Sequence, residues 1–187
     1  RAPEGYELTV GADGVVVRGT DQRGLLYGVG RLIRTMNLTM TENYFHARVT
    51  TLEVASPLSV ASAPDRPMRG IQFGYRPKTN SYDGLTPELF EQYIVDLSMF
   101  GLNQAELIPH SFDDSPYSPH FGLSHTQMNS AMSTICDKYG INVSLWYPAC
   151  NPAEIGHGCP KGNYHNKTVM DAATADYHTT LSGLPRV

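Results

Sequence analysis

The feature of this sequence that most constrains its fold is an ordered alternation of short apolar segments and amphipathic segments after residue 67. Residues 68–75, 104–108 and 142–147 have the composition of short strands, and the longer segments between them place apolar residues at helical spacing. No tight hairpin signal joins the strands. An order of strand, helix, strand, helix, strand without hairpins predicts right-handed parallel crossovers. The sequence therefore predicts an α/β fold whose first strand is Met68–Tyr75.

Two helices are predicted between these strands. In the first, Thr86 is the expected N-cap, Pro87 the first helical residue and Gly101 the stop; its apolar stripe is Leu89, Phe90, Tyr93, Ile94 and Leu97. The second helix is expected to start at Ser124 or Thr126 and to end at Gly140, with an inward face of Met128, Ala131, Met132, Ile135 and Tyr139. The pattern indicates no clear helix after the third strand.

Polar, charged and aromatic residues cluster where the three predicted strands end. In parallel α/β folds, ligands bind at the carboxyl ends of the strands. The tips here are Tyr75-Arg76, then Glu106 with His110 after its strand, then Trp146-Tyr147. The loops that follow are longer than usual, and long loops at this edge commonly serve function. The sequence therefore predicts a ligand site built from these tips.

Each tip residue has a functional and a structural interpretation. The forked donors of Arg76 suit a carboxylate or sugar hydroxyls, but a surface arginine near a turn has the same sequence context. Glu106 is costly to bury unless it is paired, so it either binds hydroxyls or pairs with an arginine. His110 is a candidate sugar contact. Either Trp146 or Tyr147 could stack on a sugar ring, and strand alternation turns the other toward the helices.

The first third of the chain has a different pattern, which predicts a small α+β domain. Residues 6–10 and 15–19 flank turn residues and read as an antiparallel hairpin. A helix capped by Thr20 or Asp21 should then run to about residue 36, with an apolar face of Leu25, Leu26, Val29, Leu32, Ile33 and Met36. Gly24 and Gly28 lie one turn apart and predict a close approach of this helix to the sheet. A further strand is expected at residues 49–55.

Composition places the domain boundary and excludes several classes of protein. The predicted division is residues 1–58, a proline-rich linker at 59–67 and a second domain at 68–187. A net charge of −4 without a basic run argues against nucleic acid as a partner, and the apolar runs are too short to span a membrane. No cofactor motif is present. Sequons at Asn37, Asn142 and Asn166 only weakly favour export, and oligomeric state is not indicated.

Cysteines and histidines leave two questions open. Cys136 lies on a predicted apolar helix face and is expected to be a buried thiol, whereas Cys150 and Cys159 either form a disulfide or are two free thiols. Potential metal ligands gather in the second half of the chain without a tight pair: His110, Asp113, Asp114, His120, His125, His157, Cys159 and His165. Because several of these residues are also ordinary turn formers, no metal site is assigned. A metal-dependent barrel hydrolase remains an alternative.

Three stretches resemble known glycoside hydrolases. Residues 19–28, Gly-Thr-Asp-Gln-Arg-Gly-Leu-Leu-Tyr-Gly, are similar to a helix start in the small domain that precedes the barrel of family-20 β-hexosaminidases and family-67 α-glucuronidases. Arg69-Gly70 after a proline-rich entry resembles the first barrel strand of these enzymes, and Gly101-Leu102-Asn103 resembles their junction before the second strand. Hexosaminidases have an aspartate shortly after the Arg-Gly pair, which is absent here, and Arg76 matches their sugar-binding arginine only with a one-residue shift.

The resemblance implies an α/β chain that begins a (β/α)8 catalytic barrel, with about three βα units, preceded by part of a small α+β domain. Residues 69–187 are about half of a barrel of roughly 250 residues. The catalytic carboxylates of these enzymes follow the fourth strand, so they are expected beyond Val187. The resemblance therefore implies the N-terminal part of a glycoside hydrolase, inactive alone, that contributes a wall of the carbohydrate site. A non-catalytic carbohydrate-binding or scaffold protein is the other alternative.

Overall fold

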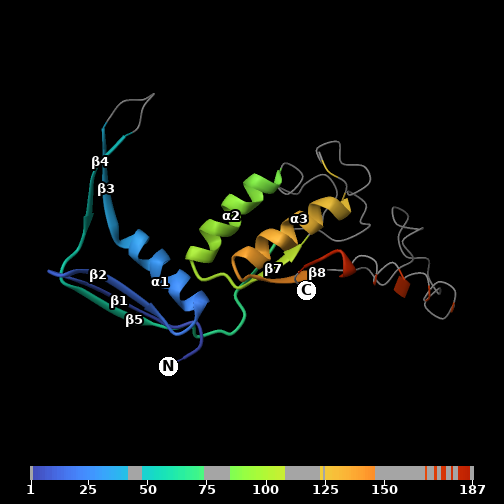
Figure 1. The fold of residues 1–187 in the computed structure, drawn as a ribbon, viewed down its shortest axis with the longest axis horizontal. Coiled ribbons are helices and arrows are strands. Elements are labelled where there is room, and N and C mark those ends of the chain that lie inside the picture. The colour runs from blue at the N-terminus through green and yellow to red at the C-terminus, as the bar shows by residue number, and fades with distance from the viewer. Residues whose placement is uncertain are drawn as a thin grey trace. The chain divides into compact units, whose positions relative to one another are not determined.

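The structure is a computed structural model that describes residues 2–41, 48–73, 85–107, 123, 125–145, 167, 171, 174–175, 178 and 181–185. The chain divides into two compact units. The first comprises Arg1–Pro67 with Asp96–Gly101, and the second comprises Met68–Val95 with Leu102–Val187. In the described part of the chain the units are built from small sheets and the helices α1, α2 and α3, so the fold is mixed α and β (Figure 1).

The first unit contains a three-stranded antiparallel sheet in the order β2-β1-β5. Strands β1 (Tyr6–Gly11) and β2 (Gly14–Gly19) form the predicted hairpin, with Leu8 opposite Val17. Strand β5 (Leu58–Ser62) pairs with the other edge of β1. The predicted linker at residues 59–67 is wrong for residues 59–62, which belong to β5. The prolines around this short strand favoured a linker, and its pairing partner β1 lies about 50 residues earlier in the chain.

A separate antiparallel ribbon pairs β3 (Met36–Thr41) with β4 (Arg48–Val54). The predicted strand at residues 49–55 corresponds to β4, whereas β3 was not predicted. The alternating segment after Met36 follows helix α1 without an intervening turn residue, so the sequence contains no stop signal between the two elements. The ribbon begins directly where α1 ends (Figure 1).

Helix α1 (Gln22–Thr35) rests on the sheet through its smallest residues. Its buried positions are Gly24, Tyr27, Gly28 and Gly30. A Cβ atom at Gly28 would lie 2.6 Å from Cγ1 of Val17, which confirms the predicted close approach. The predicted apolar face was partly wrong, because Leu25 and Ile33 are 46% and 44% exposed. Because α1 approaches the sheet along the side that carries Gly28, these two side chains remain exposed.

Asp21 caps α1, in agreement with one of the two predicted N-caps. Its carboxylate accepts hydrogen bonds from the backbone N–H groups of Gly24 at 2.8 Å and Glu4 at 2.7 Å. These two bonds, the one from Gly24 first, hold the pKa of Asp21 below its ordinary value of 3.8. The carboxylate therefore stabilises the folded state above that pH, and the contribution is lost as pH falls through the lower folded-state pKa.

This gives a prediction for Asp21→Ala. Near neutral pH the substitution should lower the free energy of unfolding by about 1–2 kcal/mol, because it removes the helix cap. The difference from the wild type should shrink as pH falls below about 4, where the cap loses its charge. Urea unfolding at several pH values measures this difference in the free energy of unfolding. Asp13→Ala, in the exposed turn between β1 and β2, is the control, and a pH-independent difference would contradict the assignment.

The second unit contains the parallel sheet that the sequence predicted. Strands β6 (Gly70–Gln72), β7 (Gln104–Leu107) and β8 (Asn142–Leu145) pair in parallel in the order β6-β7-β8. Gln72 is in register with Glu106, and Glu106 with Ser144. Strand β6 is shorter than the predicted 68–75, because residues 68, 69 and 73 are outside the strand, whereas β7 and β8 match their predictions as far as the described residues extend; residues 74, 75, 108, 146 and 147 lie outside those residues.

Helices α2 (Pro87–Met99) and α3 (His125–Lys138) connect these strands. Thr86 caps α2 as predicted, because its hydroxyl accepts a hydrogen bond from the N–H of Leu89 at 3.3 Å. Gly101 and Gly140 follow the helices with φ angles of 98° and 67°, a conformation that favours glycine, so both predicted stops are confirmed.

The inward faces of α2 and α3 differ in part from the predicted stripes. Phe90 and Ile94 are fully buried, but Leu89 and Tyr93 are 54% and 40% exposed. On α3 the buried side chains are Met128, Asn129, Met132, Ser133 and Cys136. This face is rotated relative to the prediction: Asn129 and Ser133 are buried, whereas Ala131 and Ile135 are only half-buried. The buried free thiol at Cys136 is confirmed.

Toward the C-terminus, residues 167, 171, 174, 175, 178, 181 and 182 have helical conformation. Lys167 and Asp171, one turn apart, form an ion pair at 2.6 Å. The sequence analysis predicted no clear helix in this region and was wrong for these residues. Met170, Ala173, Tyr177 and Leu181 recur at helical spacing in the sequence, a signal that the prediction did not use.

Candidate functional site

The three parallel strands present an apolar face and a polar face. Phe73, directly after β6, packs its ring 5.2 Å from the ring of Phe90 on α2, and Ala105, Leu107 and Val143 are buried. Helix α3 contacts β7 and β8, so this apolar side is covered by helices (Figure 1). Because side chains alternate along a strand, the opposite face comprises Gly70, Gln72, Gln104, Glu106, Asn142 and Ser144.

The polar face differs from the faces of most parallel sheets, which are apolar on both sides because both are buried. Apart from Gly70, all of its described residues have hydrogen-bonding side chains, and they range from half-buried to exposed. A polar face opposite a helix-covered face can bind a polar ligand or water, whereas it cannot form a dry core. On this face, three residues lie side by side across the strands, nearest their carboxyl ends: Gln72, Glu106 and Ser144. These three residues are called the row below.

Glu106 and Gln72 form the central contact of this row. The amide nitrogen Nε2 of Gln72 donates a hydrogen bond to Oε1 of Glu106 at 2.6 Å. Glu106 was expected to bind hydroxyls or to pair with an arginine, and in the described residues its partner is instead a neutral amide. A carboxylate that accepts one hydrogen bond from a neutral donor retains most of its acceptor capacity for a ligand.

Asn103 fixes the relative positions of the strands from the other end of the sheet. This side chain is 4% exposed, and its Oδ1 accepts a hydrogen bond from the N–H of Arg69 at 2.9 Å. The backbone N–H of Asn103 donates to the carbonyl of Arg69, and its own carbonyl accepts from Asn142. One residue therefore ties the starts of β6, β7 and β8 together, which sets the register that brings Gln72 beside Glu106.

Four of the five binding residues predicted from the sequence cannot be placed. Arg76, His110, Trp146 and Tyr147 lie outside the described residues, and only Glu106 lies within them. Cys150 and Cys159 also lie outside. The roles of these residues therefore stay predictions.

The sequence analysis missed two residues of the row, Gln72 and Ser144. Gln72 is the last residue of β6 but lies inside the predicted strand 68–75, so it was not counted among the residues of the strand tip. The signal that could have identified both is register. Aligning the three strands by their apolar residues Ile71, Ala105 and Val143 places Gln72, Glu106 and Ser144 side by side.

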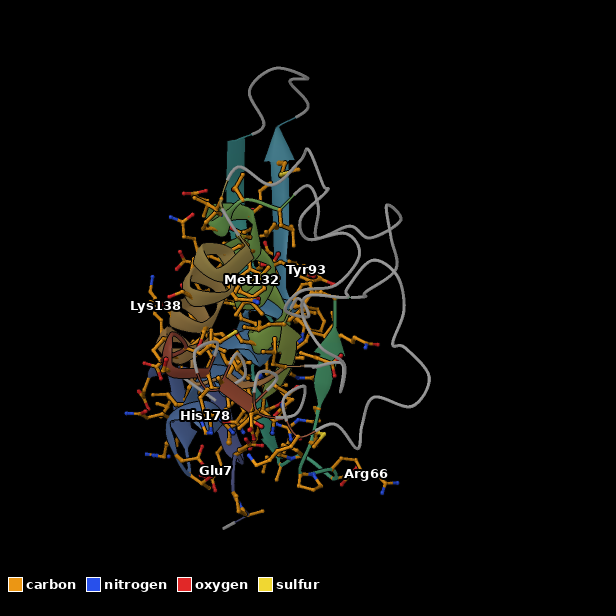
Figure 2. The ribbon with its side chains drawn as sticks, turned by 90° about the vertical axis from the view of Figure 1, so that its right-hand side faces the viewer. Glu7, Arg66, Tyr93, Met132, Lys138 and His178 are labelled. Atoms are coloured by element: carbon orange, nitrogen blue, oxygen red, sulfur yellow. The ribbon has the colours of Figure 1, made fainter. Side chains whose placement is uncertain are left out.

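Charged pairs elsewhere in the second unit lie on the outer surface of the helices. Glu91 on α2 accepts hydrogen bonds from the ammonium of Lys138 at 2.6 Å and from the hydroxyl of Tyr139 at 2.7 Å. These bonds, that from Lys138 first, lower the pKa of Glu91, and the bond to Glu91 raises the pKa of Lys138. Figure 2 shows Lys138 projecting outward, and its side chain is 63% exposed. This cluster is a solvated ion pair.

Metal and membrane signals are both lacking in the part of the chain that the structure describes. Within it, no three side chains of histidine, cysteine, aspartate or glutamate gather as metal ligands would. The predicted His and Asp loop at residues 110–122 lies outside that part, and the metal-dependent alternative stays a prediction. None of the described helices has the length and apolar character needed to cross a bilayer.

This chain resembles known proteins in structure, but its sequence matches none of the families or curated proteins compared with it. Among solved structures, CpGH84B, a family-84 glycoside hydrolase, matches with a TM-score of 0.58 and 16% identity over 100% of this chain and 29% of its own. A family-20 β-N-acetylglucosaminidase matches with a TM-score of 0.51 and 19% identity over 78% of this chain and 31% of its own.

A third match is the family-20 exo-β-N-acetylglucosaminidase from Vibrio harveyi in complex with N-acetylglucosamine, with a TM-score of 0.57 and 14% identity over 82% of this chain and 27% of its own. The chain spans about 30% of the length of these proteins. The likeness supports the resemblance to family 20 and adds family 84, while the resemblance to family 67 rests on the sequence alone. At these identities the likeness concerns the fold.

Proposed function

We propose that this chain is part of a glycoside hydrolase and forms a wall of its carbohydrate site. The observation that supports this most directly is the Gln72–Glu106 pair, which lies on a polar sheet face near the carboxyl ends of parallel strands. In parallel α/β folds that edge binds the ligand. Structural likeness to glycoside hydrolases of families 84 and 20 supports the same class.

In this proposal β6, β7 and β8 are the first three strands of a (β/α)8 barrel. Their polar face lines the upper part of the barrel, where Glu106 accepts hydrogen bonds from sugar hydroxyls and Ser144 adds a donor. The predicted tip residues Arg76, His110, Trp146 and Tyr147 extend the wall. The acid and its partner carboxylate, which glycoside hydrolysis requires in pairs, come from later strands.

The proposal makes a prediction about activity. The 187-residue chain alone should hydrolyse no aryl glycoside, because in this proposal the carboxylate pair comes from later strands, whereas a longer form that includes those strands should do so. Release of nitrophenol from a panel of nitrophenyl glycosides measures both. In the longer form Glu106→Ala should raise KM by about tenfold or more, because it removes charge-assisted hydrogen bonds to the sugar.

Two results would count against this assignment. Hydrolysis by the isolated chain would show that its own residues are sufficient for catalysis. A longer form that binds saccharides without cleaving any of them would favour the non-catalytic carbohydrate-binding alternative. Glu53→Gln is the matched control, because Glu53 lies on the exposed ribbon strand β4 and its loss removes the same charge elsewhere.

A further inference from the structure

The hydrogen-bond polarity of the Gln72–Glu106 pair restricts the kind of sugar that the proposed site can take. An ionised carboxylate only accepts hydrogen bonds, and one of the two oxygens of Glu106 is engaged by Gln72. Its other oxygen, Oε2, has no partner among the described residues. Because Gln72 uses its amide nitrogen on Glu106, its carbonyl oxygen Oε1 also remains an acceptor for a ligand.

The charge of the surrounding face also favours a ligand that donates hydrogen bonds over an anionic ligand. The described residues of this face are Gly70, Gln72, Gln104, Glu106, Asn142 and Ser144, which include one carboxylate and no lysine or arginine. A ligand lying on these residues therefore meets the acceptor oxygens of Glu106 and Gln72 and one full negative charge, while the donors on this face are the neutral amide and hydroxyl groups of its Gln, Asn and Ser side chains. Ser144, in register with Glu106, can adapt by donating or accepting.

We propose that the Gln72–Glu106 pair is a specificity determinant that selects a sugar edge rich in hydrogen-bond donors and rejects an anionic edge. The accepted edge is a pair of neighbouring hydroxyls, or the ammonium group of an unacetylated amino sugar. The rejected edge carries a carboxylate or sulfate, as in uronic acids and sulfated sugars. This inference rests on the proposed function, because it assumes that the row contacts a sugar.

The test compares three methyl glycosides that differ in one substituent: glucoside, glucosaminide and glucuronide. Their dissociation constants for the full-length protein are measured by ligand-observed NMR at low salt. The glucuronide is expected to bind about tenfold more weakly than the glucoside, because its carboxylate approaches Glu106. The glucosaminide is expected to bind at least as tightly as the glucoside. The discrimination against glucuronide should diminish as salt rises from about 20 mM to about 0.5 M.

Three variants test whether the Gln72–Glu106 pair causes the weaker binding of the glucuronide. Glu106→Gln, which can donate as well as accept, should bring the glucuronide to within about twofold of the glucoside. Gln72→Leu should weaken binding of all three glycosides several-fold and leave the discrimination in place. Glu53→Gln removes the same charge from β4 and should change neither the dissociation constants nor the ratio between glucuronide and glucoside binding.

Each outcome decides the inference. Glucuronide binding as tight as glucoside binding, or a ratio that is independent of salt, would overturn it while leaving the proposed function intact. An equal effect of Glu53→Gln and Glu106→Gln would also overturn it, because net charge would then explain the discrimination. No binding of any saccharide would remove the proposed function and the inference together. The wild-type salt dependence tests the inference even if Glu106→Gln fails to fold.

Discussion

Replacement of Phe90 by alanine is expected to lower the free energy of unfolding of the second unit by about 3–5 kcal/mol. The Phe90 side chain is fully buried, and its ring packs 5.2 Å from that of Phe73, directly after β6. The tilt of 48° between the two rings is a favourable geometry for an aromatic pair. Truncation leaves a cavity beside the Phe73 ring, and such substitutions are costly because the surrounding structure relaxes only partly. Because domains are stable by only about 5–15 kcal/mol, this loss is large.

Leu89→Ala on the same helix is the matched control for Phe90→Ala. Leu89 is 54% exposed, so its truncation should cost less than about 1 kcal/mol. Peptide-resolved hydrogen exchange of the full-length protein measures both variants, with β7 and β8 as reporters of the second unit. An effect of Phe90→Ala no larger than that of Leu89→Ala would contradict the packing described here. The Gln72–Glu106 row would be disturbed as well, since Phe73 anchors the strand that carries Gln72.

Replacement of Gly24 by alanine is expected to destabilise the first unit by about 3 kcal/mol. A Cβ atom at this position would overlap the backbone carbonyl oxygen of Gly5. Neither partner can move easily, because Gly24 donates to the cap residue Asp21 and the N–H of Gly5 donates to the hydroxyl of Thr20. The expected effect opposes intrinsic propensity, since alanine favours a helix over glycine by about 1 kcal/mol.

Gly11→Ala distinguishes a steric effect from a general effect of losing a glycine. An added Cβ at Gly11, the last residue of β1, meets no atom within 4 Å, so this variant should be close to neutral. Hydrogen exchange should show lost protection in β1, β2 and α1 for Gly24→Ala and unchanged protection in β7 and β8. Equal stability of the two variants would mean that α1 does not approach the loop before β1 this closely.

Local sequence signals predicted most of the elements of this protein. The ends of the helices depend on groups within a few residues of each other, so they can be predicted without the fold. This applies to the starts at Asp21 and Thr86 and to the stops at Gly101 and Gly140. The misses follow from the same reasoning. Strand β5 needs β1 as a partner, and the exposed positions of Leu25 and Leu89 depend on what the helices pack against.

The candidate site shows the same division between local and tertiary information. The sequence determined the alternating order of strands and helices, the polar character of the strand ends and the choice of Glu106, because each depends on neighbouring residues. Tertiary structure alone decided that Gln72 meets Glu106, since they lie 34 positions apart and their meeting depends on parallel register. Asn103 sets that register through a buried hydrogen bond to Arg69. Such long-range pairing reflects cooperative packing, which no local pattern in a single sequence records.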